Sequence, residues 1–129
     1  MMAQLEHANI TVKDPHGFAD LLCNLFDWQV RWEGEAMDGA GYTVHVGSAD
    51  SYLALYSGTG EHLHRPTVSS YTQITGLNHI GIVVDDLAKI MDRVKTAGLT
   101  PGEHHDYEPG ERFYFDTPQG IEIEVISYA

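Results

Sequence analysis

Two short segments of the chain share one alternating pattern of apolar and polar positions. Residues 5–14 read Leu-Glu-His-Ala-Asn-Ile-Thr-Val-Lys-Asp and residues 77–86 read Leu-Asn-His-Ile-Gly-Ile-Val-Val-Asp-Asp, with five of the ten positions identical. Alternation with a period of two is typical of a β-strand that buries one face. Each segment is followed by apolar residues at helical spacing, over about 17–26 and 87–97. The pattern predicts a strand followed by a helix, repeated once.

Each half of the chain closes with a pair of further strands. The pairs are predicted at 41–46 with 52–56 and at 112–115 with 121–127, separated by turn residues such as Gly, Ser, Asp and Pro. Another strand-like stretch follows each helix. The sequence therefore predicts an α+β fold, in which two βαβββ modules form a curved mixed sheet around a cleft.

The repeat divides the chain of 129 residues, a length typical of one domain. The first module is expected at residues 1–57 and the second at 76–129. Residues 58–75, rich in Gly, Thr and Ser, are expected to link them. The two modules together would make one domain.

Strand alternation also predicts which side chains share a face. His7 and His79 occupy the same position in the repeat, on the polar face of each opening strand. In the last strand Glu122 and Glu124 alternate with Ile and Val residues. If the aliphatic faces pack on the helices, the two histidines and the two carboxylates lie on the opposite, concave faces.

The composition of the chain excludes some classes of binding partner. The chain has 7 Lys+Arg against 19 Asp+Glu, a formal net charge of −12, which argues against binding of nucleic acid or of an anionic membrane surface. The charge fits a neutral or cationic small-molecule partner. A single cysteine, Cys23, excludes an internal disulfide, and the first residues do not read as a signal peptide, so a cytoplasmic location is predicted.

These features resemble the vicinal oxygen chelate superfamily, which includes glyoxalase I, extradiol dioxygenases, fosfomycin-resistance enzymes and bleomycin-resistance proteins. The resemblance rests on the paired modules, the Leu-x-His openings, and the closing run Thr-Pro-Gln-Gly-Ile-Glu-Ile-Glu-Val at 117–125. It implies metal ligands at His7, His79 and Glu124, with Glu122 as the alternative if the register slips by two residues. Ala54 stands where a fourth ligand is expected, which disfavours lactoylglutathione lyase (glyoxalase I) activity.

Two imidazoles and one carboxylate leave open coordination positions for two adjacent substrate oxygens. This donor set suits Fe(II), Mn(II), Ni(II) or Zn(II). The resemblance implies a metal-dependent enzyme acting on a small oxygenated substrate by lyase, isomerase, dioxygenase or thiol-addition chemistry. Tyr114 or His45 would move a proton. Each also has a simpler interpretation, Tyr114 as an aromatic of the cavity wall and His45 as a solvent-facing residue.

The alternative is a metal-free protein that binds or sequesters a small molecule, as bleomycin-resistance members do. The acidic charge and the aromatic residues Trp32, Tyr52 and Tyr56 fit that function. The resemblance also implies a homodimer. The remaining histidines are expected outside the site, in the linker (His62, His64) and in a solvated loop (His104, His105).

Overall fold

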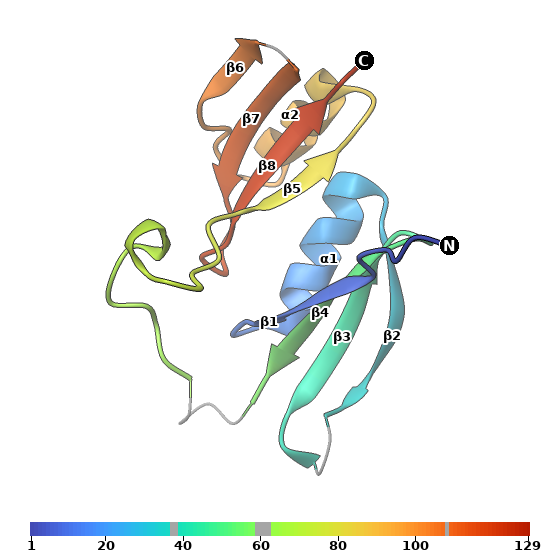
Figure 1. The fold of residues 1–129 in the computed structure, drawn as a ribbon, viewed down its shortest axis with the longest axis vertical. Coiled ribbons are helices and arrows are strands. Elements are labelled where there is room, and N and C mark those ends of the chain that lie inside the picture. The colour runs from blue at the N-terminus through green and yellow to red at the C-terminus, as the bar shows by residue number, and fades with distance from the viewer. Residues whose placement is uncertain (37–38, 59–62, 108) are drawn as a thin grey trace. The chain divides into compact units, whose positions relative to one another are not determined.

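The computed structural model describes residues 1–36, 39–58, 63–107 and 109–129. The chain divides into two compact units, residues 1–64 and 65–129, and each is described by itself. In its described residues, each unit contains one α-helix and one four-stranded mixed sheet (Figure 1). The α+β fold and the repeated βαβββ design predicted from the sequence are confirmed.

The first unit runs through five elements in chain order: β1 (His7–Thr11), α1 (Pro15–Phe26), β2 (Gln29–Glu35), β3 (Tyr42–Gly47) and β4 (Tyr52–Ser57). Its strand order is β1-β4-β3-β2, with β1 parallel to β4 and the other pairs antiparallel. The second unit repeats the order: β5 (Ile80–Val83), α2 (Leu87–Thr96), β6 (His104–Tyr107), β7 (Gly110–Asp116) and β8 (Glu122–Ser127). Its sheet, β5-β8-β7-β6, has the same parallel and antiparallel pairings.

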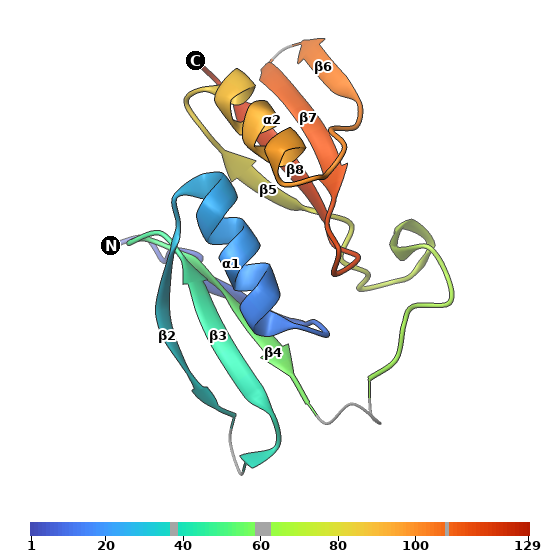
Figure 2. The ribbon, with the colours of Figure 1, turned by 180° about the vertical axis from the view of Figure 1, so that it is seen from behind.

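Each helix covers one face of its own sheet, as Figure 2 shows for α1 and α2. Phe18, Leu22 and Leu25 are spaced one helical turn apart on α1 and are at most 1% exposed. The buried residues of β3 and β4 on the same side include Val44 and Leu55. The side chains that alternate with them point to the other face of the sheet, where the candidate site residues lie.

Each helix begins at an aspartate whose carboxylate accepts a hydrogen bond from a backbone N–H of the first turn. Asp14 accepts from the Gly17 N–H at 3.0 Å, and Asp86 accepts from the Lys89 N–H at 3.1 Å. These caps satisfy donors that have no partner inside the helix. The aspartates belong to the sequence repeat, so part of the repeat sets where the helices start.

The strand registers define which residues of the two modules are equivalent. Ala8 pairs with Leu53, and Ile80 pairs with Ile123, so the next residues of β4 and β8, Ala54 and Glu124, hold the same position. Across the next strand pair, His45 lies opposite Ala54. Tyr114 lies opposite Glu124 in the same way. The first module therefore presents an alanine and a histidine where the second presents a glutamate and a tyrosine.

The Cys23 thiol on α1 is expected to react slowly with alkylating reagents. Burial raises its pKa, and the nearby carboxylate of Asp20 raises it further, so the thiolate fraction at pH 8 is smaller than that of a free cysteine. Iodoacetamide labelling followed by mass spectrometry would measure the rate. Labelling in urea is the control, and equal rates for the native and unfolded protein would contradict the expectation.

Among the described residues, no helix has the length and apolar character that a membrane crossing requires.

Candidate functional site

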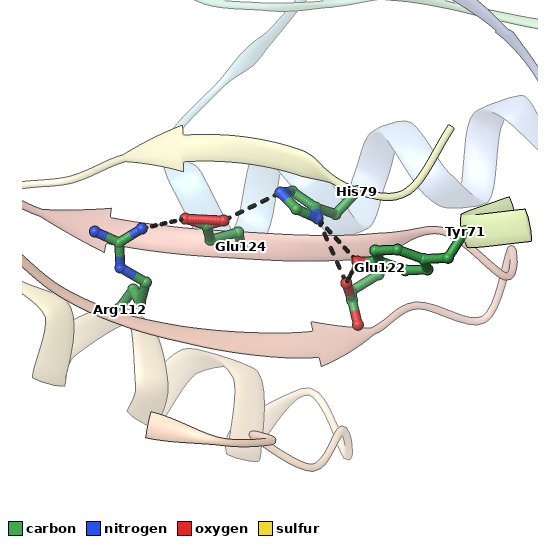
Figure 3. Close-up of polar contacts among 5 residues, drawn as sticks. All are labelled: Tyr71, His79, Arg112, Glu122 and Glu124. Atoms are coloured by element: carbon green, nitrogen blue, oxygen red, sulfur yellow. Dashed lines mark hydrogen bonds and ion pairs between the residues drawn. The ribbon is translucent and has the colours of Figure 1, made fainter. Parts of the chain in front are cut away.

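His79 stands between two carboxylates on the open face of the second sheet. Its Nε2 is 3.1 Å from Oε2 of Glu124, and its Nδ1 is 3.6 Å from Oε1 of Glu122 (Figure 3). The two glutamates are adjacent on this face because they are two residues apart on β8. His79 immediately precedes β5, the strand parallel to β8. The structure therefore brings together two of the three predicted ligands and the alternative ligand.

Glu122, His79 and Glu124 form a row of contacting side chains. Two further residues, which the sequence analysis did not identify, extend this row. Arg112 Nη1 donates a hydrogen bond to Oε1 of Glu124 at 3.1 Å, and the Tyr71 hydroxyl lies 3.4 Å from both His79 Nδ1 and Glu122 Oε1 (Figure 3). Arg112 could have been found by alternation, since it precedes Tyr114 by two residues on one strand. Tyr71 could not, because it lies in a short 3-10 helix (Ser70–Thr72) within the expected linker.

Tyr114 lies beside this row in its protonated form. Burial raises the pKa of its phenol, and a hydrogen bond to Glu124 raises it further. Its ring meets His79 edge-on, with the centroids 5.7 Å apart. Tyr114 is thus a proton donor aimed at the carboxylate.

The first module has a related arrangement built from aromatic rings. The Tyr52 ring stacks between those of His7 and His45, with centroid separations of 4.9 Å and 4.6 Å. Trp32 lies against His45 at 5.2 Å, and the Arg31 guanidinium lies 4.5 Å from the centre of the Tyr52 ring. Burial lowers the pKa of His45, and the charges of His7 and Arg31 lower it further, so the ring is neutral at pH 7.

His7 and His79 share one feature of metal-ligating histidines, which is a carboxylate beside Nδ1. His7 Nδ1 is 2.9 Å from Oε1 of Glu6, just as His79 Nδ1 faces Glu122. A carboxylate beside Nδ1 favours a proton on that nitrogen and leaves the Nε2 lone pair for another partner. The glutamates come from different places, Glu6 from the residue before His7 and Glu122 from β8, so the sequence repeat alone does not create the similarity.

The donors of the second module fit a divalent metal ion. Two donors about 2.0–2.2 Å from one ion and roughly at right angles would be about 3 Å apart, close to the His79–Glu124 distance of 3.1 Å. The neighbouring backbone leaves room, because a Cβ atom added at Gly81, the residue opposite Glu124, would meet no atom within 4 Å. Among the described residues, however, no group of three or more His, Cys, Asp or Glu could hold a metal. A further ligand is needed to complete a site.

Two of the other histidines, His104 and His105, lie in a different environment from the one expected. His104 and His105 belong to strand β6 and not to a loop, because β6 pairs along its length with β7. Their Nε2 atoms face carboxylates, His104 toward Glu111 at 3.6 Å and His105 toward Glu103 at 3.1 Å. His64 is exposed. His62 lies outside the described residues.

The chain matches the family model of the Glyoxalase/Bleomycin resistance protein/Dioxygenase superfamily over residues 4–125. It therefore belongs to this superfamily, also known as the vicinal oxygen chelate superfamily. A search of curated protein sequences gives no significant match.

Solved structures of the same fold have low sequence identity. A glyoxylase/bleomycin resistance protein/dioxygenase domain from Frankia sp. EAN1pec matches with a TM-score of 0.79 and 16% identity, over 98% of this chain and 93% of that one. Fosfomycin resistance protein FosX from Mesorhizobium loti matches with a TM-score of 0.71 and 22% identity, over 98% and 92%. A FosX mutant from Listeria monocytogenes, in complex with Mn(II) and 1S,2S-dihydroxypropylphosphonic acid, matches with a TM-score of 0.71 and 18% identity, over 98% and 93%.

Proposed function

We propose that this protein is a metal-dependent enzyme that binds a small oxygenated substrate through adjacent oxygens. His79 and Glu124 are the proposed ligands in the second module, and His7 is the proposed ligand in the first. The choice of His7 rests on its place in the repeat and on the carboxylate beside its Nδ1. The ion would be Fe(II), Mn(II), Ni(II) or Zn(II).

One observation carries the proposal. His79 has a carboxylate beside Nδ1, and its Nε2 lies 3.1 Å from a second carboxylate that is only 11% exposed. A structural ion pair would need only one carboxylate. The pair of carboxylates, one on each ring nitrogen, resembles a metal-ligating histidine oriented by a supporting acid. The Mn(II) complex of a FosX mutant with the same fold agrees with a divalent ion in this kind of scaffold.

Each module contributes one proposed proton-transfer residue. When bound, the metal would supply Lewis-acid stabilisation of a developing enolate or oxyanion. Tyr114 is protonated at neutral pH and can donate a proton to such an oxygen. His45, whose lowered pKa keeps it neutral, can accept one. Ala54, at the position equivalent to Glu124, leaves this set without a fourth protein ligand.

Metal analysis of protein prepared without a histidine tag tests the proposal. After reconstitution and dialysis, the wild-type chain is expected to retain close to one divalent ion per site, and a His7→Ala/Glu124→Ala variant is expected to retain almost none. Circular dichroism of both proteins checks that the variant is folded. A wild-type protein that retains no divalent ion from any of the four metals would overturn the proposal.

A metal-free binding protein is the second candidate function. The stack of Trp32, His45, Tyr52 and His7 rings on the first sheet favours it, since flat aromatic faces bind planar or cationic groups. The same metal analysis separates the two functions. Binding of aromatic cations by a wild-type protein that retains no metal would favour this candidate.

A homodimer is also proposed. β5 is the edge strand of its sheet and carries the exposed Val83 (63%), and an unpaired strand edge is a surface with which a second copy can pair. Sedimentation equilibrium would then give twice the chain mass of 14.3 kDa. A single-chain mass at micromolar concentration would exclude the dimer. A cytoplasmic location remains a prediction from the sequence.

A further inference from the structure

The hydrogen-bond donors of Arg112 are only partly used. Among the described residues, three buried side-chain nitrogen or oxygen atoms have no hydrogen-bond partner: Nε and Nη2 of Arg112, and Oγ1 of Thr43. Buried polar groups in folded proteins are nearly always paired, and each exception calls for an explanation, such as a catalytic role or a bound ion. Two of these three atoms lie next to the proposed metal ligand Glu124.

The three atoms belong to equivalent positions of the repeat. His45 and Tyr114 occupy the same register, so Thr43 and Arg112, two residues earlier on β3 and β7, are also equivalent. Both face the open side of their sheet, because the residues that alternate with them, such as Phe113, are buried on the helix side. The two modules thus place unpaired polar groups at one shared position.

The contacts of Arg112 leave one edge of its guanidinium group for a ligand. Nη1 donates to Oε1 of Glu124, and the Tyr107 ring lies 5.3 Å from the guanidinium carbon. The Nε–H and one Nη2–H point the same way along the remaining edge. Two parallel N–H donors match the two oxygens of a carboxylate, which accepts both at once.

We propose that Arg112 binds the carboxylate group of the substrate, so that the substrate is a small organic acid with further oxygens for the metal. This inference rests on the proposed function, because it places the acid group beside the ligand Glu124. The summed charge of the side chains around Arg112 agrees with the binding of one carboxylate. Arg112, Glu122 and Glu124 sum to −1, which a divalent ion changes to +1, the charge that one carboxylate neutralises.

Access to this edge depends on the strand that carries Tyr107. β6 is the outer strand of its sheet and, among the strands that the structure describes, pairs with β7 alone. The Tyr107 side chain is 55% exposed. It can therefore turn away from the face of the Arg112 guanidinium group without breaking the sheet.

Side-chain NMR of arginine tests the inference on the full chain. The protein has only four arginines, and the Nε–H signal of Arg112 is identified by its loss in an Arg112→Lys variant. Titration with glycolate is compared with glycolamide, its neutral analogue, in the metal-free and the Zn(II)-loaded protein. Glycolate is expected to shift the Arg112 signal saturably, more tightly with Zn(II), while glycolamide leaves it in place.

Calorimetry on the Lys variant gives the second measurement. Lysine keeps the charge beside Glu124 but cannot present two parallel donors, so glycolate affinity is expected to fall roughly tenfold or more. Arg65→Lys, an exposed arginine of the same unit, is the matched control and should leave the affinity unchanged.

The two possible failures can be told apart. Binding of Fe(II), Mn(II), Ni(II) and Zn(II) is measured first on the same samples, and the absence of binding by all four would overturn the proposed function. The Arg112 signal reports the carboxylate contact itself. No saturable shift with glycolate in either form, or an equal shift with glycolamide, would overturn the role of Arg112 even if Zn(II) binds.

Discussion

Replacing His79 by alanine is expected to lower the affinity for Mn(II) or Zn(II) by about 100-fold or more, since it removes a proposed ligand. Replacing Glu122 by glutamine should cost less, about 10- to 100-fold, because it removes only the carboxylate beside Nδ1. Calorimetry with a competing chelator measures both values. The specific prediction is that His79→Ala weakens metal binding more than replacement of Glu122 by glutamine does.

His104→Ala is the matched control for this series. It removes a histidine that also faces a carboxylate, Glu111, on the same sheet. Metal affinity is expected to stay at the wild-type value. If His104→Ala weakens binding as much as His79→Ala, or if neither variant weakens it, the proposed ligand set is wrong.

The second prediction with a large expected effect concerns the free energy of unfolding of the second unit. Phe113 is fully buried on β7, with its ring stacked on that of Phe115 at a centroid distance of 6.1 Å. Phe113→Ala is expected to reduce the free energy of unfolding by about 3–5 kcal/mol through lost burial and the cavity left behind. The total stability of a domain is about 5–15 kcal/mol, so this loss is a large part of it.

Urea unfolding followed by far-UV circular dichroism measures this loss. Tyr128→Ala is the control, because Tyr128 is an aromatic residue of the same unit with 62% exposure. A surface change of this kind typically alters stability by about 0.5 kcal/mol or less. A Phe113→Ala variant as stable as the control would show that β7 does not supply the core of this unit.

The repeat made much of the fold predictable. Alternation at 5–14 and 77–86, with helical spacing after each, predicted two βαβββ modules because burial of one sheet face imposes a period of two. The same alternation predicted that Glu122 and Glu124 share a face with His79, as they do in the second unit. Helix and strand ends differ from the prediction by a few residues. The starts of the two helices are set by the Asp14 and Asp86 caps.

The remainder of the site depends on tertiary contacts that carry no periodic signal. Tyr71 reaches His79 from the expected linker, which the sequence marks only as rich in Gly, Thr and Ser. The pairing of Arg112 with Glu124 depends on the offset between β7 and β8, which a turn between strands can change by two residues without altering the hydrophobic pattern. His104 and His105 were predicted in a loop because β6 is short and polar.

The most direct test of the central claim is the protonation of each histidine ring in the Zn(II)-loaded protein, measured by long-range ¹H–¹⁵N NMR of the imidazole nitrogens. We predict that Zn(II) binding gives both His7 and His79 a protonated Nδ1 and a metal-bound Nε2, because a carboxylate faces Nδ1 in each. Rings of His7 and His79 that stay unchanged on addition of Zn(II), while those of His104 and His105 respond, would contradict it.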